Sequence, residues 1–257
     1  MMNDPIEHIR SQFTRQAHAY ATSVQASDEA AHARLVDACL PKPEDCVLDV
    51  ACGPGFLTMA FARRCRRVVG IDATEAFLDL ARKEAAKRGL SNIRFEQGLA
   101  TDLPYTDATF DLVVCRAAFH HFPEPARVLA EMCRVVKPGG RVVTADFLTS
   151  ENPGEARLHH EIECLCDPTH GRALTGTEFL ELFHRTGLKV VLENRRRLHY
   201  DLDEWIRHGG PAPEAEAEIR RRFQAALMKD ETGLQVRMEG DKIRFTHQTL
   251  LLMGERM

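Results

Sequence analysis

The sequence lacks the long apolar segments of membrane and secreted proteins. Its longest stretch without Asp, Glu, Lys or Arg runs from Val50 to Ala62, is interrupted by two glycines and a proline, and falls short of the roughly 18 apolar residues of a membrane span. The first ten residues, MMNDPIEHIR, contain no apolar region of a signal peptide. We therefore expect a cytoplasmic protein without membrane attachment.

The sequence also lacks an excess of positive charge. Lys and Arg total 34 against 38 Asp and Glu, a formal net charge of −4, whereas a dedicated nucleic-acid binder is usually strongly basic. Hydrophobic residues make up 44% and charged residues 28% of the chain, which is globular composition. Because 257 residues lie near the upper limit of a single hydrophobic core, residues 1–257 are expected to form one domain.

Cysteine pairs with CxxC spacing are missing too. The chain has eight cysteines, but no two of them have CxxC spacing, and several lie in apolar runs where free cysteine behaves as a small hydrophobe. The sequence therefore predicts reduced thiols, no disulfide framework and no metal site.

Short apolar runs alternate with helical patterns along the chain. Strands are predicted at residues 46–50, 67–71, 92–96, 110–115, 141–147, 188–192 and 246–253. Helical periodicity fills the intervals between most of them, as in residues 125–136, where apolar residues recur on one face. This alternation predicts βαβ units and a parallel sheet covered by helices on both faces.

A glycine-rich turn follows the first predicted strand, in the run Val47 to Gly55 (VLDVACGPG). The Lys-Ser/Thr ending of a phosphate-binding loop is missing, and Thr58 stands where a dinucleotide fingerprint has a third Gly or Ala. Asp49 at the start of the turn would repel a pyrophosphate and suits an ammonium group. Asp72 ends the second strand, where an acid accepts hydrogen bonds from ribose hydroxyls. A nucleoside with a cationic, phosphate-free tail, such as S-adenosylmethionine (SAM), fits both acids.

Four segments carry a resemblance to a known family: LDVACGPG (48–55), VVGIDAT (68–74), LPYTDATFDLVVCRAAFHHFPEP (103–125) and RVVKPGGRVVTADF (134–147). The stretch from Val47 to Phe147 resembles class I SAM-dependent methyltransferases, in the group similar to ubiquinone and menaquinone biosynthesis enzymes. The resemblance implies an α/β fold with a doubly wound, Rossmann-like, seven-stranded and mostly parallel sheet. Its last strand, 246–253, would be antiparallel.

The same resemblance implies the residues that bind the cofactor. Four of them would surround the methionyl part of SAM: Asp49, Ala51, Gly53 and Gly55. Asp72 would bind the ribose, and Arg116 would lie near the methionyl end. Ala73, Leu99 and Ala100 would lie beside the adenine. Tyr20 belongs to the N-terminal segment that would fold over SAM. Two positions depart from the family pattern, which often has Gly in place of Ala51 and an acid in place of Leu99. With leucine there, we expect apolar and backbone contacts to hold the adenine.

His120 and Asp146 are the candidate catalytic residues. They follow the fourth and fifth predicted strands, which are neighbours in the family topology, so both side chains can reach one rim. Sugar O-methyltransferases of natural-product pathways are similar in having a His-to-Asp interval of 26 residues. His120 would act as a general base oriented by Asp146, as in other His–Asp pairs. The alternative is that His120 only packs behind the loop, the role we predict for His121.

The remaining segments are expected to surround the substrates. Residues 1–45 would form lid helices over SAM, with an ordinary docked helix as the alternative. Residues 151–175 and 198–241 are too long for plain loops and are predicted to form helical insertions that cap the acceptor. His170 and Arg172 are candidates to face the acceptor, although they could equally stabilise their loop.

The sequence thus predicts a SAM-dependent methyltransferase acting on a small molecule, most plausibly at a hydroxyl oxygen. Residues 115–118 (Cys-Arg-Ala-Ala) lack the Asn/Asp-Pro-Pro-aromatic run of enzymes that methylate adenine or glutamine nitrogen. The alternatives are a tRNA or protein methyltransferase, which would need a basic groove, and a non-catalytic SAM-binding regulator.

Overall fold

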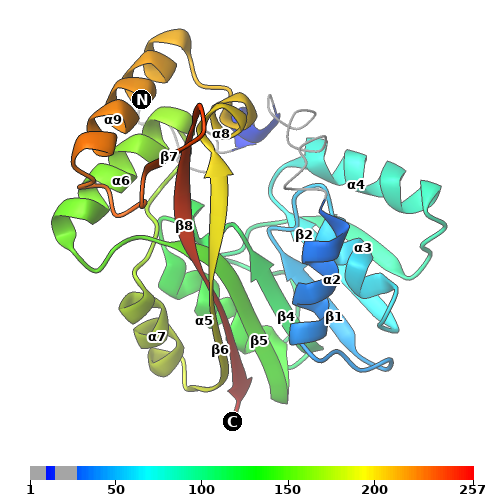
Figure 1. The fold of residues 1–257 in the computed structure, drawn as a ribbon. Coiled ribbons are helices and arrows are strands. Elements are labelled where there is room, and N and C mark those ends of the chain that lie inside the picture. The colour runs from blue at the N-terminus through cyan, green and yellow to red at the C-terminus, as the bar shows by residue number, and fades with distance from the viewer. Residues whose placement is uncertain (1–9, 15–27) are drawn as a thin grey trace, which may run out of the picture.

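The computed structural model describes residues 10–14 and 28–257. The helices are α2 (Glu29–Ala38), α3 (Phe56–Ala62), α4 (Glu75–Lys87), η1 (Phe119–His121), α5 (Pro125–Val135), α6 (Pro153–Cys166), α7 (Gly176–Arg185), α8 (Leu202–Gly209) and α9 (Pro213–Met228). The strands are β1 (Cys46–Val50), β2 (Arg67–Asp72), β3 (Ile93–Gln97), β4 (Phe110–Arg116), β5 (Val136–Leu148), β6 (Leu188–Asp201), β7 (Arg237–Glu239) and β8 (Lys242–Arg256). Figure 1 shows their arrangement.

The strands form one mixed sheet in the order β3-β2-β1-β4-β5-β8-β6, with the short β7 paired to β8. The pairs from β3 to β5 are parallel, and β8 runs antiparallel to both β5 and β6. The expected doubly wound sheet with an antiparallel last strand is therefore confirmed. The chain reverses its direction of winding after β3, so a crevice opens beside the carboxyl ends of β1 and β4, where ligands bind in such sheets.

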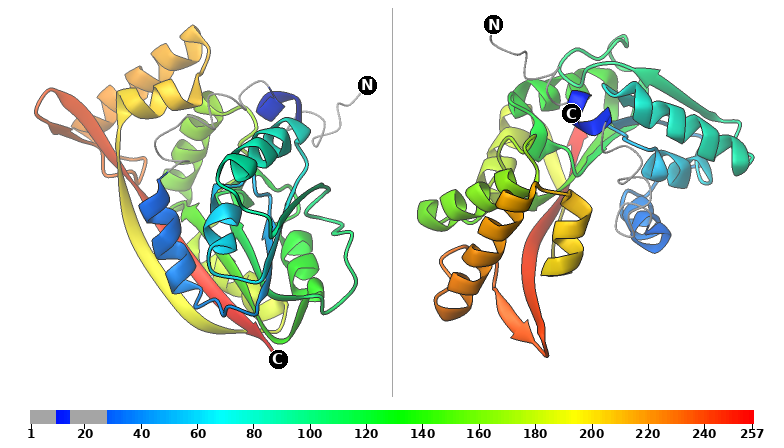
Figure 2. Two further views of the ribbon diagram at one scale, coloured as in Figure 1. Left: turned by 90° about the vertical axis from the view of Figure 1, so that its right-hand side faces the viewer. Right: turned by 90° about the horizontal axis from the view of Figure 1, so that it is seen from above.

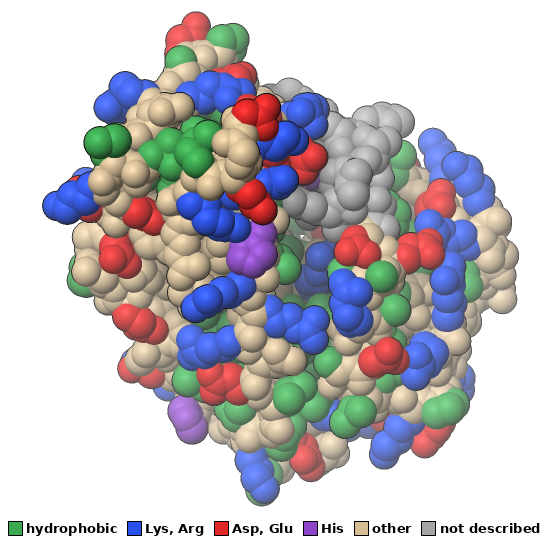
Figure 3. Space-filling model, in the orientation of Figure 1, with side chains coloured by type: hydrophobic (Ala, Val, Ile, Leu, Met, Phe, Trp, Pro, Cys, Tyr) green, Lys and Arg blue, Asp and Glu red, His purple; other side chains and the backbone are tan. Residues whose placement is uncertain are grey.

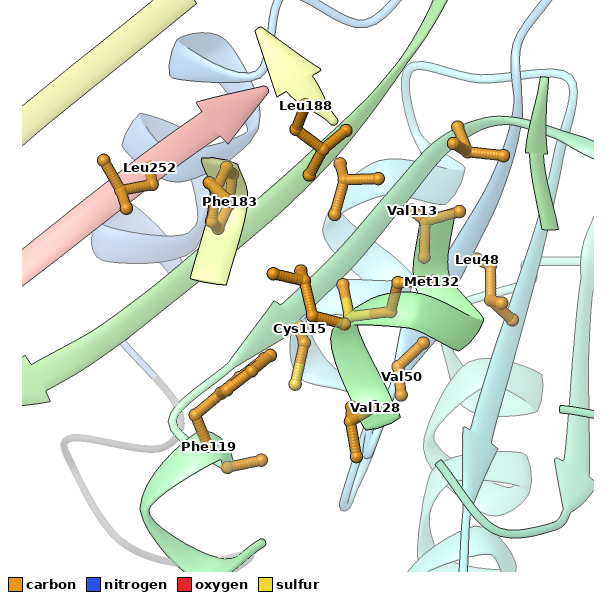
Figure 4. Packing of buried hydrophobic residues seen from close by; sticks show 14 of the residues in the cluster. Leu48, Val50, Val113, Cys115, Phe119, Val128, Met132, Phe183, Leu188 and Leu252 are labelled. Carbon is orange, nitrogen blue, oxygen red and sulfur yellow. The ribbon is translucent and has the colours of Figure 1, made fainter. Parts of the chain in front are cut away.

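Both faces of the sheet are buried, because alternate residues of each central strand point to opposite sides. In β4, Val113 and Cys115 join a cluster with α5 and α7, while Leu112 and Val114 join one with α2 and α3. Figure 4 shows the first cluster, in which Val128 and Met132 of α5 pack against strand residues. This double coverage explains why the central strands consist of nearly continuous apolar runs.

A second structural unit, the cap, joins α6, α8, α9 and β7 to the far ends of β6 and β8. It has an apolar cluster of its own, which includes Ile162, Trp205, Phe223 and Phe245. β6 and β8 pair from Leu188–Arg256 to Asp201–Arg244 and reach past the rest of the sheet into the cap (Figure 2). The segment 151–175 contains α6, and the segment 198–241 contains the end of β6, α8, α9 and β7, joined by non-helical stretches. That the two segments cap the acceptor stays a prediction.

The strand whose length differs most from the sequence prediction is β6, which extends to Asp201 rather than ending at residue 192. The extension contains Arg195, Arg196 and Arg197, a run that indicates solvated surface. β6 is the edge strand and most of these side chains are exposed, so the polar run fits the pairing with β8. The apolar run on which the prediction rested ends at residue 192, so it gave no sign of the polar continuation of the strand.

Candidate functional site

A cavity of about 340 Å³ lies where β1, β2, β4 and β5 end and the cap begins. This volume falls within the range of small-molecule sites, roughly 300–1,000 Å³. One part of its wall comes from the segments after the first, second, third and fourth strands: Asp49, Ala51, Cys52, Gly53, Asp72, Ala73, Thr74, Gly98, Ala100 and Arg116. The other part comes from the loop 117–122, from β5 and from the cap: His120, His121, Phe147, Glu163, Cys166, Tyr200, Trp205, His208 and His247.

The glycine-rich turn brings backbone close to this cavity. Ala51, Gly53 and Gly55 have φ angles of 55°, 52° and 75°, in the left-handed region that favours glycine. A Cβ atom on Gly55 would come within 2.7 Å of the Phe95 ring, while one on Gly53 would meet no atom within 4 Å. Gly55 is thus required by packing, and Gly53 leaves open space at the wall of the cavity.

Asp49 is buried at the end of β1, and its Oδ2 accepts a hydrogen bond of 2.6 Å from Thr58 Oγ1. Burial raises the pKa of Asp49 to about 7. A cationic group beside it would favour the charged carboxylate. Thr58 stands where a dinucleotide motif would need a glycine or alanine, and the structure shows that its hydroxyl group orients Asp49.

Asp72 ties the turn to the end of β2. Its Oδ2 accepts from the Gly53 backbone N–H and its Oδ1 from the Thr74 N–H, both at 2.8 Å. Burial raises the pKa of Asp72, and these two hydrogen bonds oppose the rise. Each carboxylate oxygen has a second lone pair, so Asp72 can also accept from ribose hydroxyls.

The predicted adenine contacts divide into two groups. Ala73 and Ala100 line the cavity, together with Gly98. Leu99 lies outside this lining, and its backbone forms a bridge with Asp102. Ala73, Gly98 and Ala100 thus give this part of the wall small residues, and the way in which an adenine would be held there stays a prediction.

Arg116 follows β4 and forms a contact that the sequence did not reveal. Its Nη1 lies 3.2 Å from Nε2 of the buried His32 of α2. Burial and the adjacent guanidinium lower the pKa of His32 to about 4, so its ring is neutral and accepts the hydrogen bond. His32 thus holds Arg116 at the cavity wall without competing for an anion.

His120 and Asp146, chosen from two separate motifs, are in direct contact. Nδ1 of His120 lies 2.8 Å from Oδ1 of Asp146. Asp146 is held in turn by the backbone N–H groups of Phe119 and Phe147, each 2.8 Å away. Burial alone would lower the pKa of His120, but the adjacent carboxylate outweighs this effect and leaves the pKa above its ordinary value.

His170 and Arg172 do not line the cavity among the residues described. The backbone N–H groups of Gly171 and Arg172 both donate to the His120 carbonyl at 2.9 Å. The Arg172 side chain forms an ion pair with Glu178 at 2.8 Å, and the buried His170 ring lies 5.7 Å from that of His120. Both residues thus belong to the loop that supports His120.

Two further features concern the entrance. Phe13, in the short helical segment 10–14, contacts the rings of Phe77 and His121 at centroid distances of 5.6 and 5.1 Å and lines the cavity. Tyr20, the other predicted lid residue, lies outside the described residues. The prediction of a lid over residues 1–45 therefore rests on Phe13 and on the α2 residue His32, which also lines the cavity.

The sequence did not reveal which residues of the cap line the cavity. Glu163, Trp205, His208 and His247 come from α6, α8 and β8, and 84 residues separate the first from the last. No short motif joins them, so sequence spacing carried no signal. The three histidines in the segment 159–170 were the available hint.

Comparison with known proteins establishes the family. Residues 41–187 match the methyltransferase domain family. Over 215 residues the chain is 30% identical to an uncharacterized methyltransferase, YcgJ of Bacillus subtilis, covering 83% of this chain and 85% of the relative. The crystal structure of YcgJ superposes with a TM-score of 0.80 at 27% identity, covering 88% of this chain and 98% of that one. The chain belongs to the class I SAM-dependent methyltransferases, whose methyl donor is SAM.

Relatives with a named substrate match over a shorter region. A demethylmenaquinone methyltransferase of Deinococcus radiodurans is 48% identical over 103 residues, 39% of this chain and 42% of the relative. A 27-O-demethylrifamycin SV methyltransferase of Amycolatopsis mediterranei is 36% identical over 143 residues, 53% of this chain and 52% of the relative. The chain thus spans about half the length of these two relatives, and the named activities belong to them.

Figure 3 shows Lys and Arg side chains intermixed with Asp and Glu on one face of the molecule. Within residues 10–14 and 28–257, no helix has both the length and the apolar composition needed to cross a bilayer.

Proposed function

We propose that this methyltransferase transfers the methyl group of SAM to a hydroxyl oxygen of a small molecule. The observation that carries the proposal is the 2.8 Å contact between His120 Nδ1 and Asp146 Oδ1 at a cavity that also exposes the glycine-rich turn. Asp146 can only accept when ionised, so Nδ1 donates and Nε2 of His120 carries the free lone pair. That tautomer is the one needed to remove a proton from a hydroxyl group.

The residues from Asp49 to Arg116 form the proposed cofactor end. SAM supplies an activated methyl carbon for in-line displacement. Asp49 would bind its ammonium group, Asp72 its ribose and Arg116 its carboxylate, while Ala51, Gly53 and Gly55 keep backbone close to the methionyl part. Ala73 and Ala100, which line the cavity, would flank the adenine. The open space beside Gly53 and the carboxylates of Asp49 and Asp72, both in the cavity wall, support this assignment.

The cap forms the proposed acceptor end. Phe147, Tyr200 and Trp205 offer aromatic surface, and His120, His208 and His247 offer polar groups among them. Such a wall suits an acceptor with an apolar or aromatic body and few polar substituents. The volume of about 340 Å³ favours a small molecule over tRNA or a protein, and the intermixed surface charge in Figure 3 agrees.

In this proposal His170 and Arg172 position His120 rather than touch the acceptor. Their loop supplies two backbone hydrogen bonds to the His120 carbonyl. The base would therefore be fixed at its backbone by residues 171–172 and at its ring by Asp146.

The experiment is an acceptor screen with methyl-labelled SAM and metabolite extract, followed by NMR of the purified labelled product. We expect the new methyl signal at the position of a methoxy group. A methyl group on nitrogen, carbon or sulfur would contradict the proposed acceptor atom. Label in RNA or protein would favour the macromolecular alternative, and SAM binding without any transfer would favour a regulator.

A further inference from the structure

A cluster of three buried side chains lies at the junction of the cap and the sheet. His159 and Glu163 are one turn apart on α6, and His247 lies on β8. Their exposed fractions are 2%, 7% and 4%. Nε2 of His159 and Nε2 of His247 lie 3.2 and 3.0 Å from the same oxygen, Oε1 of Glu163.

The spacing of these atoms matches a metal coordination shell. One ligand atom from each residue lies within 4.8 Å of the other two. Zinc bonds to histidine nitrogen and carboxylate oxygen are about 2.0–2.2 Å long, so neighbouring ligand atoms in a tetrahedral shell are about 3.3–3.5 Å apart. The two measured separations are within a few tenths of an ångström of this value.

The hydrogen bonds within the cluster leave one group unsatisfied. Nε2 of His247 is buried and has no hydrogen-bond partner, although it is close to Glu163. Two imidazole rings therefore converge on one carboxylate oxygen that forms a hydrogen bond with His159 alone. A buried polar atom without a partner is costly, and a cation between the three residues would satisfy it.

The cluster also separates two cavities. Glu163 and His247 line the large cavity described above, while His159 lines a neighbouring one of about 310 Å³ beside Ser150, Asp230 and Thr232. This second cavity gives an ion a route to the cluster. The Phe147 ring lies between His247 and His120, with centroid distances of 4.9 and 4.5 Å, so the cluster is distinct from the His120–Asp146 pair.

We propose that His159, Glu163 and His247 bind one divalent transition-metal ion of the Zn²⁺ type. Two histidines and one glutamate form a known zinc ligand set, in which a fourth position is left for water or substrate. Because two of the three ligands line the large cavity, that position is open to an oxygen atom of the acceptor. The ion would also fix α6 to β8 and so hold the cap on the sheet.

The expectation of no metal site rested on cysteine spacing, and this set contains no cysteine. His159 and Glu163 have helical i, i+4 spacing, but the third ligand is 84 residues further along the chain. Only the pairing of β8 beside the cap brings His247 to them.

The test is a titration of the full-length, metal-stripped protein with Co²⁺, a spectroscopic substitute for Zn²⁺. We expect one ion per chain, visible absorption of a four- or five-coordinate site, and no sulfur-to-cobalt charge transfer in the near ultraviolet. His247→Gln and Glu163→Gln should each weaken Co²⁺ binding by 10-fold or more. His184→Gln, which changes an exposed histidine on α7, is the matched control and should bind like the wild type.

Several results would overturn the proposal. They are the absence of stoichiometric Co²⁺ binding by the wild type, a charge-transfer band showing cysteine ligands, or equal loss of binding in His184→Gln. The wild-type spectrum decides alone if a cluster variant does not fold, which circular dichroism would show. SAM binding is measured separately without metal, so a failure of this site is distinguishable from a failure of the proposed methyl transfer.

Discussion

The two ends of the cavity are built from different kinds of residue. The proposed cofactor end comes from Asp49 to Arg116, a stretch of continuous chain, and uses backbone groups, small side chains and the carboxylates of Asp49 and Asp72. The acceptor end comes from α6, α8, β6 and β8 and uses aromatic rings, histidines and a glutamate. The first end therefore suits a ligand shared by a whole family, and the second one a ligand particular to this chain.

His120 stands at the boundary between the two ends, and its removal should have the largest effect. We expect His120→Ala to lower turnover about 10²- to 10⁴-fold, the usual contribution of a general base. SAM affinity should stay within about threefold, because the ring contacts Asp146, Phe147 and His170 and, among the described residues, none of those proposed to bind SAM. Calorimetry for SAM and a steady-state assay on the identified acceptor measure the two quantities, with His184→Ala as the surface control. Near-normal turnover would mean that His120 only packs.

The pH dependence of turnover also distinguishes a general base at position 120 from a histidine that only packs. A base works only when deprotonated, so wild-type turnover should rise with pH as His120 loses its proton. The adjacent Asp146 raises the pKa of His120, so the midpoint of this limb in the free enzyme should lie above the ordinary histidine value of about 6.5. The limb should be missing in His120→Ala. A limb that persists in this variant would assign the titration to another group.

At the cofactor end, SAM affinity should depend on pH through Asp49. Burial raises the pKa of Asp49 to about 7, and only its ionised form attracts an ammonium group. Below pH 7 the carboxyl group must first lose a proton, so affinity should fall by up to about tenfold per pH unit. Calorimetry at pH 5.5, 6.25 and 7 measures this slope. Asp49→Asn should bind more weakly at pH 7 and show little slope. An unchanged slope in Asp49→Asn would remove Asp49 from the cofactor end.

Phe13 should give the smallest effect of these. It contacts Phe77 and His121 at the entrance, and we expect Phe13→Ala to weaken SAM binding by roughly threefold to tenfold through lost apolar contact. Hydrogen exchange of residues 10–14 should slow when SAM is added, since a covering segment is held by its ligand. Equal exchange with and without SAM would favour an ordinary docked helix.

The residues proposed for the cofactor end could be named from the sequence for a physical reason. A glycine-rich turn and an acid at a strand end are local features, so their residues are adjacent before the chain folds. The parallel strands were predictable as well, because continuous apolar runs mark buried parallel strands, whereas the order of the strands came from the family resemblance. His120 and Asp146 lie in two such motifs at neighbouring strand ends, and the contact between them is observed.

The acceptor end was not predictable in the same way. Glu163 and His247 meet only because β8 pairs with β5 and β6 beside the cap. The length of β6 was not predictable because the second half of this edge strand is polar. The contact between His32 and Arg116 joins residues that no sequence motif connects. Long-range contacts of this kind depend on the packing of the whole chain, not on local spacing.

The most direct test of the two-ended cavity is a calorimetric SAM titration of Asp72→Ala beside His208→Ala. Asp72 lies at the cofactor end, and a lost hydrogen bond to a charged acceptor costs about 1.5–3 kcal/mol, so we predict a roughly 10- to 100-fold weaker affinity. His208 lies at the acceptor end, so His208→Ala should bind SAM within about threefold of the wild type. Circular dichroism confirms that both variants are folded. Unchanged affinity in Asp72→Ala, or a larger loss in His208→Ala, would contradict the division of the cavity.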